Sequence, residues 1–304
     1  MTFSVPRDGG LFITDISERC ASLIDVGIWE GITRTQLAAW LTNFETDAEK
    51  YFAACVLDTL IFRSEAQTNA LLQQWFQRTL PFAARHLGLS GANEPDWTFA
   101  LRKGGADPRV RLVPVVREDD PPTKSAHHVL RLMKRNFQVD ENWISYARHL
   151  SSGLPPGLEA IIFVDDFLAT GDQFHEFFET ESLPLLANHV KMAYLPLVGY
   201  VDGINKLGSQ YSGLIVRSVE VLNASNRLFH TECECFSDGS NTASDAADFY
   251  YDLIARRGIS LAGNDRRGHG GLELAYSFAH ASPDNCLPIL WWDQAPSWKP
   301  LFNR

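Results

Sequence analysis

Hydrophobic residues recur at helical spacing in three successive stretches of the first ninety residues. A repeat of three or four positions predicts amphipathic helices. The residues concerned are Leu37, Trp40, Leu41 and Phe44, then Phe52, Val56, Leu57, Leu60 and Ile61, then Leu71, Leu72, Trp75, Phe76 and Leu80. Pro81 is expected to stop the third helix, because proline has no amide hydrogen to continue it. The pattern predicts a layer of three packed helices.

From about Trp97 the pattern changes to short strands that alternate with helices. The strand candidates are residues 110–116, 160–164, 192–201 and 214–222, and helices are expected after Ser125 and around Phe174. Residues 160–164 are apolar throughout, as is typical of a parallel strand buried on both faces. This order predicts an α/β fold with a five-stranded, mainly parallel twisted sheet and helices on both faces.

The pattern weakens after Asn223. A helix is expected at 246–255, a loop rich in glycine, arginine and histidine at 264–271, and an aromatic C-terminal segment. We therefore expect a helical N-terminal layer (1–95), an α/β core (96–225) and a C-terminal hood (226–304) that packs on the core as one structural unit. Trp291, Trp292 and Trp298 can stack a base, but we expect at least two of them in the core.

Composition narrows the class of protein. The 304 residues are 45% hydrophobic and 21% charged, which is ordinary for a globular chain. The net charge of −10 disfavours broad binding to a phosphate backbone, although it leaves room for a local basic patch. No apolar run is long enough to cross a bilayer, and the N-terminal residues lack the features of a secretory signal. Five scattered cysteines fit reduced thiols, so we expect a cytoplasmic protein without membrane contact.

The chemistry concentrates in one segment that follows the apolar strand at 160–164. Asp165 and Asp166 come directly after that strand, where parallel α/β sheets usually bind ligands, and carboxylates there can accept hydrogen bonds from both ribose hydroxyls. The next residues open a helix, and backbone amides at a helix start favour phosphate. These residues are Ala169, Thr170, Gly171, Asp172 and Gln173. Together the two halves predict a ribose 5-phosphate site.

A structural explanation competes for part of this segment. Thr170 and Gln173 match a capping box, in which Thr170 caps the helix and Gln173 reaches back to it. The capping box does not account for two adjacent acids after a buried strand.

Two other loops carry weaker candidates. Arg117 with Lys124 and Ser125, or alternatively Arg102–Gly105, can supply cations for a diphosphate. Arg266, Arg267 and His269 can form a lid or recognise a base. A solvated or flexible surface loop is the alternative in each case.

The segment from Val164 to Gln173 resembles the PRPP-binding motif of type I phosphoribosyltransferases: an apolar strand, paired acids, three residues and Thr-Gly. The resemblance implies that Asp165 and Asp166 bind the ribose and that Ala169–Gln173 surrounds the 5-phosphate. Ala169 and Gln173 stand where hydroxyl residues are common in that family, and Asp172 adds negative charge near the phosphate.

The whole chain resembles a subgroup of phosphoribosyltransferase-like effectors in bacterial conflict and anti-phage operons, some of them linked to retrons. The matching residues are Trp40, Phe44, Lys124-Ser125, Val164-Asp-Asp-Phe, Thr170-Gly-Asp-Gln173, Gly268-His-Gly-Gly271, Asn285-Cys-Leu-Pro-Ile-Leu-Trp291, Trp298-Lys-Pro-Leu-Phe302 and Arg304. The resemblance implies a toxin effector that acts on a nucleotide and is restrained by partners until infection. Those partners would be proteins of the same operon, a reverse transcriptase–nucleic acid complex or a DNA-binding protein.

We therefore expect a phosphoribosyltransferase-type enzyme that acts on PRPP or a related nucleotide at C1′, with Mg²⁺ on the diphosphate and Asp165 and Asp166 as the catalytic pair. Asp165 and Asp166 would contact the Mg²⁺ ion only indirectly. A non-catalytic nucleotide sensor is the second hypothesis, and an interaction subunit with a vestigial pocket is the third.

Overall fold

A computed structural model describes residues 3–89, 92, 97, 108–121, 124–236, 239–295 and 297–302. The chain forms two compact units. We call Asn69–Leu222 the central unit, and Met1–Thr68 together with Asn223–Arg304 the split unit. The three-part division expected from the sequence stays a prediction.

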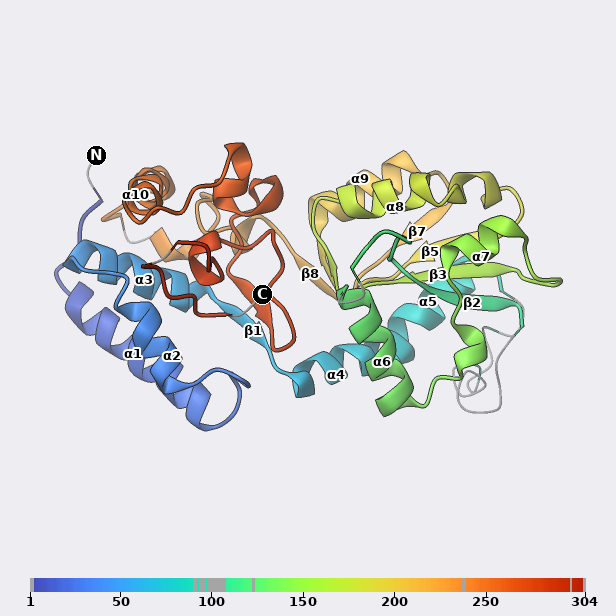
Figure 1. Cartoon of the computed structure of the whole chain (residues 1–304), viewed down its shortest axis with the longest axis horizontal. Coiled ribbons are helices and arrows are strands. Elements are labelled where there is room, and N and C mark those ends of the chain that lie inside the picture. Colours follow the sequence, from blue (N-terminus) through green and yellow to red (C-terminus); the bar gives the residue numbers. More distant parts are fainter. Residues whose placement is uncertain are drawn as a thin grey trace. The chain divides into compact units, whose positions relative to one another are not determined.

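The central unit contains two parallel sheets (Figure 1). The larger runs in the order β2 (Val110–Pro114), β3 (Ala160–Val164), β5 (Lys191–Tyr194) and β7 (Leu214–Val216). The smaller runs in the order β4 (Phe167–Leu168), β6 (Val198–Tyr200) and β8 (Glu220–Leu222). Each strand of the smaller sheet follows a strand of the larger one after a short break. The α/β class and the parallel strands are confirmed, but the single five-stranded sheet is wrong, because these breaks divide the strands into a sheet of four and a sheet of three.

Helices cover both faces of the larger sheet (Figure 1). One face carries α7 (Ala147–Ser152), α8 (Asp172–Thr180) and α9 (Val201–Gln210), and the other carries α5 (Leu80–His86) and α6 (Ser125–Phe137). The segment before α5 consists of α4 (Glu65–Gln74) and a π-helical turn, Trp75–Thr79. The sequence therefore delimits α6 and α8 well, because amphipathic spacing and a polar start mark both of them.

Pro81 does not stop the third helix, contrary to the prediction. It lies in the first turn of α5, directly after the π-helical turn. A proline at this position costs little, because amides in the first turn of a helix need no partner within it. The Trp75 indole donates a hydrogen bond of 2.8 Å to the Leu195 carbonyl and ties this segment to the sheet.

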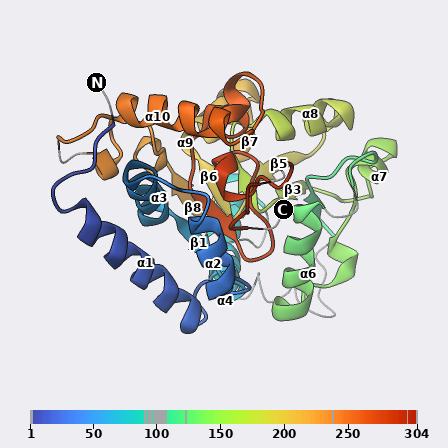
Figure 2. The same ribbon diagram turned by 60° about the vertical axis from the view of Figure 1, so that its left-hand side comes forward.

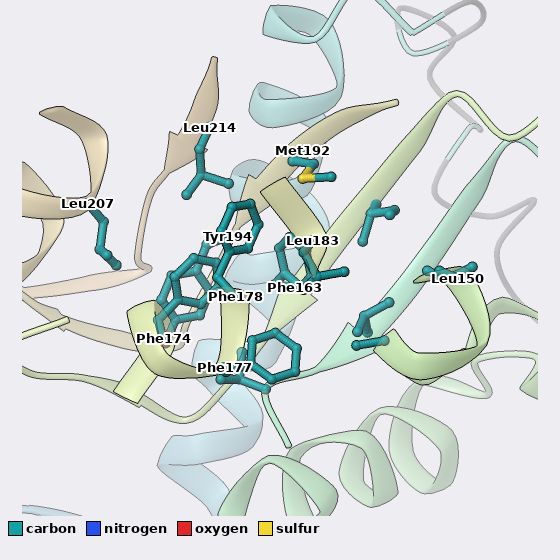
Figure 3. Close-up of a cluster of buried hydrophobic side chains, with 14 of the residues drawn as sticks. Leu150, Phe163, Phe174, Phe177, Phe178, Leu183, Met192, Tyr194, Leu207 and Leu214 are labelled. Carbon is teal, nitrogen blue, oxygen red and sulfur yellow. The ribbon is translucent and has the colours of Figure 1, made fainter. Parts of the chain in front are cut away.

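An apolar core lies between the larger sheet and the α7, α8 and α9 face (Figure 3). Phe174, Phe177 and Phe178 of α8 surround Phe163 of β3 with edge-on ring contacts of 5.4 to 5.9 Å between centroids. Phe174 also stacks on Tyr194 of β5 at 4.1 Å. Aromatic contacts of this kind add to the free energy of burial and hold α8 at a fixed position on the sheet.

The split unit is mainly helical. Its elements are α1 (Gly9–Asp25), α2 (Arg34–Leu41), α3 (Asp47–Thr59), α10 (Ala243–Arg256) and the parallel pair β1 (Ile61–Arg63) and β9 (Tyr276–Phe278). Helix α1 lies beside α3 (Figure 2). A capping box of Thr46 and Glu49 begins α3.

The C-terminal tryptophans pack inside the split unit, as expected. Trp291, Trp292 and Trp298 are all at most 8% exposed. The indoles of Trp40 and Trp298 both donate to the Ile289 carbonyl, at 2.7 and 3.1 Å. None of the described helices is both long enough and apolar enough to cross a membrane.

Candidate functional site

Asp165 and Asp166 fill the break between β3 and β4. Their carbonyls still accept strand-like hydrogen bonds from the amides of Leu197 and Val198, each at 3.0 Å. The two acids are therefore held as part of the strand although no strand is assigned there. This break lies at the carboxyl edge of the larger sheet, which is the usual ligand edge of an open parallel sheet.

Asp165 and Asp166 have different hydrogen-bond partners in the fold. Asp165 lies on the α8 side, where its Oδ2 accepts a hydrogen bond of 3.2 Å from the Tyr194 hydroxyl. Asp166 lies on the α6 side, where its Oδ1 accepts a hydrogen bond of 2.7 Å from the hydroxyl of Ser125, the first residue of α6. One acid thus enters the aromatic core, and the other meets the start of a helix.

The two carboxyl groups are electrostatically coupled. Asp165 and Asp166 are only 2% and 5% exposed. Burial raises the pKa of Asp165 well above its usual range, and the charge of Asp166 and a hydrogen bond between the two side chains raise it further. Lys124 lowers it, but by less. Burial likewise raises the pKa of Tyr194. Asp165 Oδ1 also accepts a hydrogen bond of 3.0 Å from the backbone amide of Asp166.

The loop after β4 leaves backbone amides unused. Among the described residues, no acceptor takes a hydrogen bond from the amides of Ala169, Thr170 or Gly171. Gly171 has a φ of +85° at the start of α8, a conformation that glycine adopts most readily. Unpaired amides in this position form a cradle for an anion.

Helix α9 packs closely against this loop. A Cβ atom on Gly203 would lie 2.0 Å from the Ala169 carbonyl oxygen, so that only glycine fits there. A Cβ atom on Gly171 would lie 3.0 Å from Leu207 of the same helix. The shape of the candidate phosphate loop therefore depends on α9.

The structure does not contain the capping box considered for Thr170 and Gln173. Gly171, not Thr170, precedes α8, and no side chain caps the helix. The Thr170 hydroxyl instead donates to Asp172 at 2.7 Å and accepts from its amide at 3.3 Å. Gln173 is exposed. The negative charge of Asp172 is balanced by Lys206 of α9, whose Nζ lies 2.5 Å from Asp172 Oδ1.

The candidate diphosphate residues have different environments. Ser125 contacts Asp166, and Lys124 is near enough to lower the pKa of Asp165. Arg117 is engaged elsewhere by carboxylates within the chain. These are Asp119 at 3.6 Å, Asp120 at 3.1 Å and Glu176 at 3.0 Å. The alternative loop, Arg102–Gly105, lies outside the described residues.

The candidate lid belongs to the split unit, where its residues have partners within the chain. Arg267 pairs with the buried carboxylate of Glu273 at 2.5 Å, and Arg266 donates to the Leu261 carbonyl at 3.0 Å. His269 Nδ1 lies 3.3 Å from Asp265. A lid or base-recognition role for Arg266, Arg267 and His269 stays a prediction.

Sequence reasoning missed Tyr194, Gly203 and Lys206. Tyr194 lies in a predicted strand and Gly203 in a helix, and no local motif marks either residue. Lys206 is an ordinary surface lysine in sequence. Each acts on the candidate site through contacts made across the fold, which spacing along the chain does not reveal.

The parallel sheet, the acids at its carboxyl edge and the amide-lined loop define a phosphoribosyltransferase-like α/β protein. A sequence model of the PRTase-CE family matches residues 37–304. Because this match covers most of the chain, the protein belongs to the PRTase-CE family. The match also supports a function of the phosphoribosyltransferase-like kind. A search of curated proteins finds no match.

Proposed function

We propose that the central unit binds the ribose 5-phosphate part of PRPP or a related nucleotide, and that the protein is a phosphoribosyltransferase-type effector. The observation that carries the proposal is the acid pair beside the loop of unpaired amides, at the carboxyl edge of a parallel sheet. Burying two adjacent carboxyls costs free energy, and such pairs at a ligand edge are typical of functional sites.

The two acids have different tasks in this proposal. The Asp166 carboxylate accepts a hydrogen bond from a ribose hydroxyl. This bond is made beside the hydrogen bond from the Ser125 hydroxyl or replaces it. Asp165 fixes Asp166 by accepting a hydrogen bond from its backbone amide, while the Tyr194 hydroxyl fixes Asp165. Direct contact of Asp165 with the sugar stays a prediction. The amides of Ala169, Thr170 and Gly171 hold the phosphate, and reaction at C1′ passes through an oxocarbenium-like state stabilised by positioning and charge.

Mg²⁺ enters the proposal with the diphosphate. Among the described residues, no three histidine, cysteine or acidic side chains gather as a metal site. Magnesium commonly binds through substrate phosphates and water with few protein ligands. The hydrogen bonds that Asp165 and Asp166 already make within the chain fit such an indirect role.

Binding of PRPP and of ribose 5-phosphate tests the site directly. Titration calorimetry should show saturable binding to the wild type and binding at least about tenfold weaker to Asp166→Asn, since a hydrogen bond to a charged group contributes about 1.5–3 kcal/mol. Asp202→Asn, an exposed residue of α9, is the matched control and should bind like the wild type. Equal binding by the wild type and Asp166→Asn, or no binding by either, would contradict the proposal.

A nucleotide sensor without turnover is the second candidate, and Arg117 favours it. The three carboxylates around this guanidinium leave it poorly available for a diphosphate. Nucleotide and PRPP pools measured in expressing cells separate the two hypotheses. A depleted pool that recovers in Asp166→Asn supports the enzyme, whereas unchanged pools under activating conditions support the sensor.

The anti-phage role belongs to the same proposal and rests on the resemblance to conflict-operon effectors. Partner proteins of the operon, a reverse transcriptase–nucleic acid complex or a DNA-binding protein would restrain the effector until infection. Coexpression with the neighbouring genes should reduce phage plaque counts, and Asp166→Asn should restore them. If the Asp166→Asn variant reduces plaque counts as much as the wild type does, the site has no part in defence.

A further inference from the structure

The central unit has a cavity at the ends of its strands that lie opposite to the two acids. It has a volume of about 770 Å³. Glu159 lies just before β3, Lys191 begins β5 and Leu214 begins β7, and all three line the cavity. Asp165 and Asp166 follow the other end of β3. The cavity is therefore separate from the candidate ribose-phosphate site.

The inner wall of this cavity is apolar. Side chains of α8, of the sheet and of the residues just before its strands form it, and all are at most 8% exposed, namely Leu158, Phe178, Val190, Met192 and Leu214. Phe178, Met192 and Leu214 project into the same region between sheet and helix (Figure 3). A flat apolar molecule placed against this wall would remove further hydrophobic surface from water.

A fixed aromatic ring adds to the wall. Tyr211, at the end of α9, packs against Phe178 with 4.7 Å between centroids. Its hydroxyl donates to Glu179 at 2.9 Å and bonds to His175 Nδ1 at 2.5 Å. Because α8 holds this hydroxyl twice, the ring is positioned before any ligand arrives, which lowers the entropic cost of binding.

The rim of the cavity carries nitrogen groups. His86, Asn188, His189 and Lys191 line it and are exposed. Lys191 Nζ makes a long hydrogen bond of 3.3 Å to the Gly88 carbonyl, and it has no carboxylate within 4.0 Å in the described part of the chain. A cation without a carboxylate partner is available to an anionic ligand.

We propose that this cavity is a second ligand site, which binds a small molecule with a flat aromatic body and one anionic group. The aromatic body lies against Phe178, Met192 and Tyr211, and the anion meets Lys191 at the rim. The volume lies within the usual range for small-molecule sites, roughly 300–1,000 Å³.

The fluorescent probe 8-anilinonaphthalene-1-sulfonate has this chemistry and contains neither ribose nor phosphate. The folded protein should bind it at one saturable site. Its neutral analogue, N-phenyl-1-naphthylamine, should bind at least about threefold more weakly, as expected for loss of one partly exposed ion pair. Asp166→Asn should leave probe binding unchanged, so this outcome is independent of the ribose-phosphate proposal.

Variants locate the site. Ala187→Trp and Asn188→Trp, at exposed lining positions, should each reduce probe binding at least about tenfold by filling the cavity. Lys191→Gln should weaken it about threefold, whereas Arg135→Gln, the same charge change on the exposed side of α6, should not. If both tryptophan variants bound the probe with wild-type affinity, the proposed ligand site would be wrong. Equal effects of Lys191→Gln and Arg135→Gln would overturn the assignment of the anion to Lys191.

Discussion

Each unit of this protein buries a carboxyl group almost completely, but in opposite electrostatic environments. Glu49 in the split unit is 1% exposed, and Asp165 in the central unit is 2% exposed. Glu49 lies 2.7 Å from the guanidinium of Arg256 and 2.8 Å from that of Arg257. Asp165 has instead a tyrosine hydroxyl and a second acid.

The pKa values of the two groups shift in opposite directions. Burial alone would raise the pKa of Glu49, but the amides of Glu45 and Thr46 and the two arginines outweigh it and lower the pKa. At Asp165 burial and the neighbouring acid act together and raise it. Arginine partners compensate the charge of a buried acid, so Glu49 is accounted for by contacts within the fold. Two buried acids side by side at the ligand edge of a parallel sheet fit the functional site proposed above.

The largest effect should come from the loop beside the central acids. In Gly203→Val the new side chain would overlap the Ala169 carbonyl, so the loop must move. We expect loss of ribose 5-phosphate binding by more than about tenfold and destabilisation of about 3 kcal/mol or more. Gly208→Val is the control, because a Cβ atom on Gly208 meets nothing within 4 Å on the same helix. Calorimetry measures the binding and urea unfolding measures the stability. If Gly203→Val and Gly208→Val gave the same results, the close contact of Gly203 with Ala169 would be refuted.

A smaller effect is expected at the structural acid of the split unit. Glu49→Gln keeps the shape but leaves Arg256 and Arg257 without their shared negative charge. The free energy of unfolding should fall by about 2–3 kcal/mol, below the usual value for a fully buried pair because Arg256 is half exposed. Ribose 5-phosphate binding at 25 °C should not change. If Glu49→Gln lost ribose 5-phosphate binding but kept its stability, the structural role assigned to Glu49 would be wrong.

The smallest effect at pH 5 is expected for Asp165→Asn, and this effect should change with pH. The folded-state pKa of Asp165 is raised, so its protonation stabilises the fold fully below the unfolded pKa of about 4, and this contribution is lost as pH rises toward the folded value. Asparagine does not titrate. Urea unfolding between pH 5 and 8 should therefore show the wild type losing stability relative to the variant as pH rises, by up to about 1.4 kcal/mol for each pH unit below the folded pKa. A difference that stays constant with pH would mean that Asp165 is ionised throughout.

Local patterns predicted the parts of the fold that depend on neighbouring residues. Five consecutive apolar residues marked β3, and amphipathic spacing marked α6 and α8. The π-helical turn before Pro81 and the breaks that separate β3 from β4, β5 from β6 and β7 from β8 were missed. Both depend on packing between distant segments, such as the hydrogen bond from Trp75 to Leu195.

The sequence by itself determined that two acids follow a buried strand and precede a helix, and this order alone indicates a ribose-phosphate motif. Only the tertiary structure decided what each acid contacts. Tyr194 comes from β5, Ser125 from α6 and Gly203 from α9, and each reaches the Asp165–Gly171 segment because parallel crossovers bring distant residues to one edge. The pKa of Asp165 and the shape of the loop depend on distances between these groups in space. Spacing along the chain does not reveal those distances.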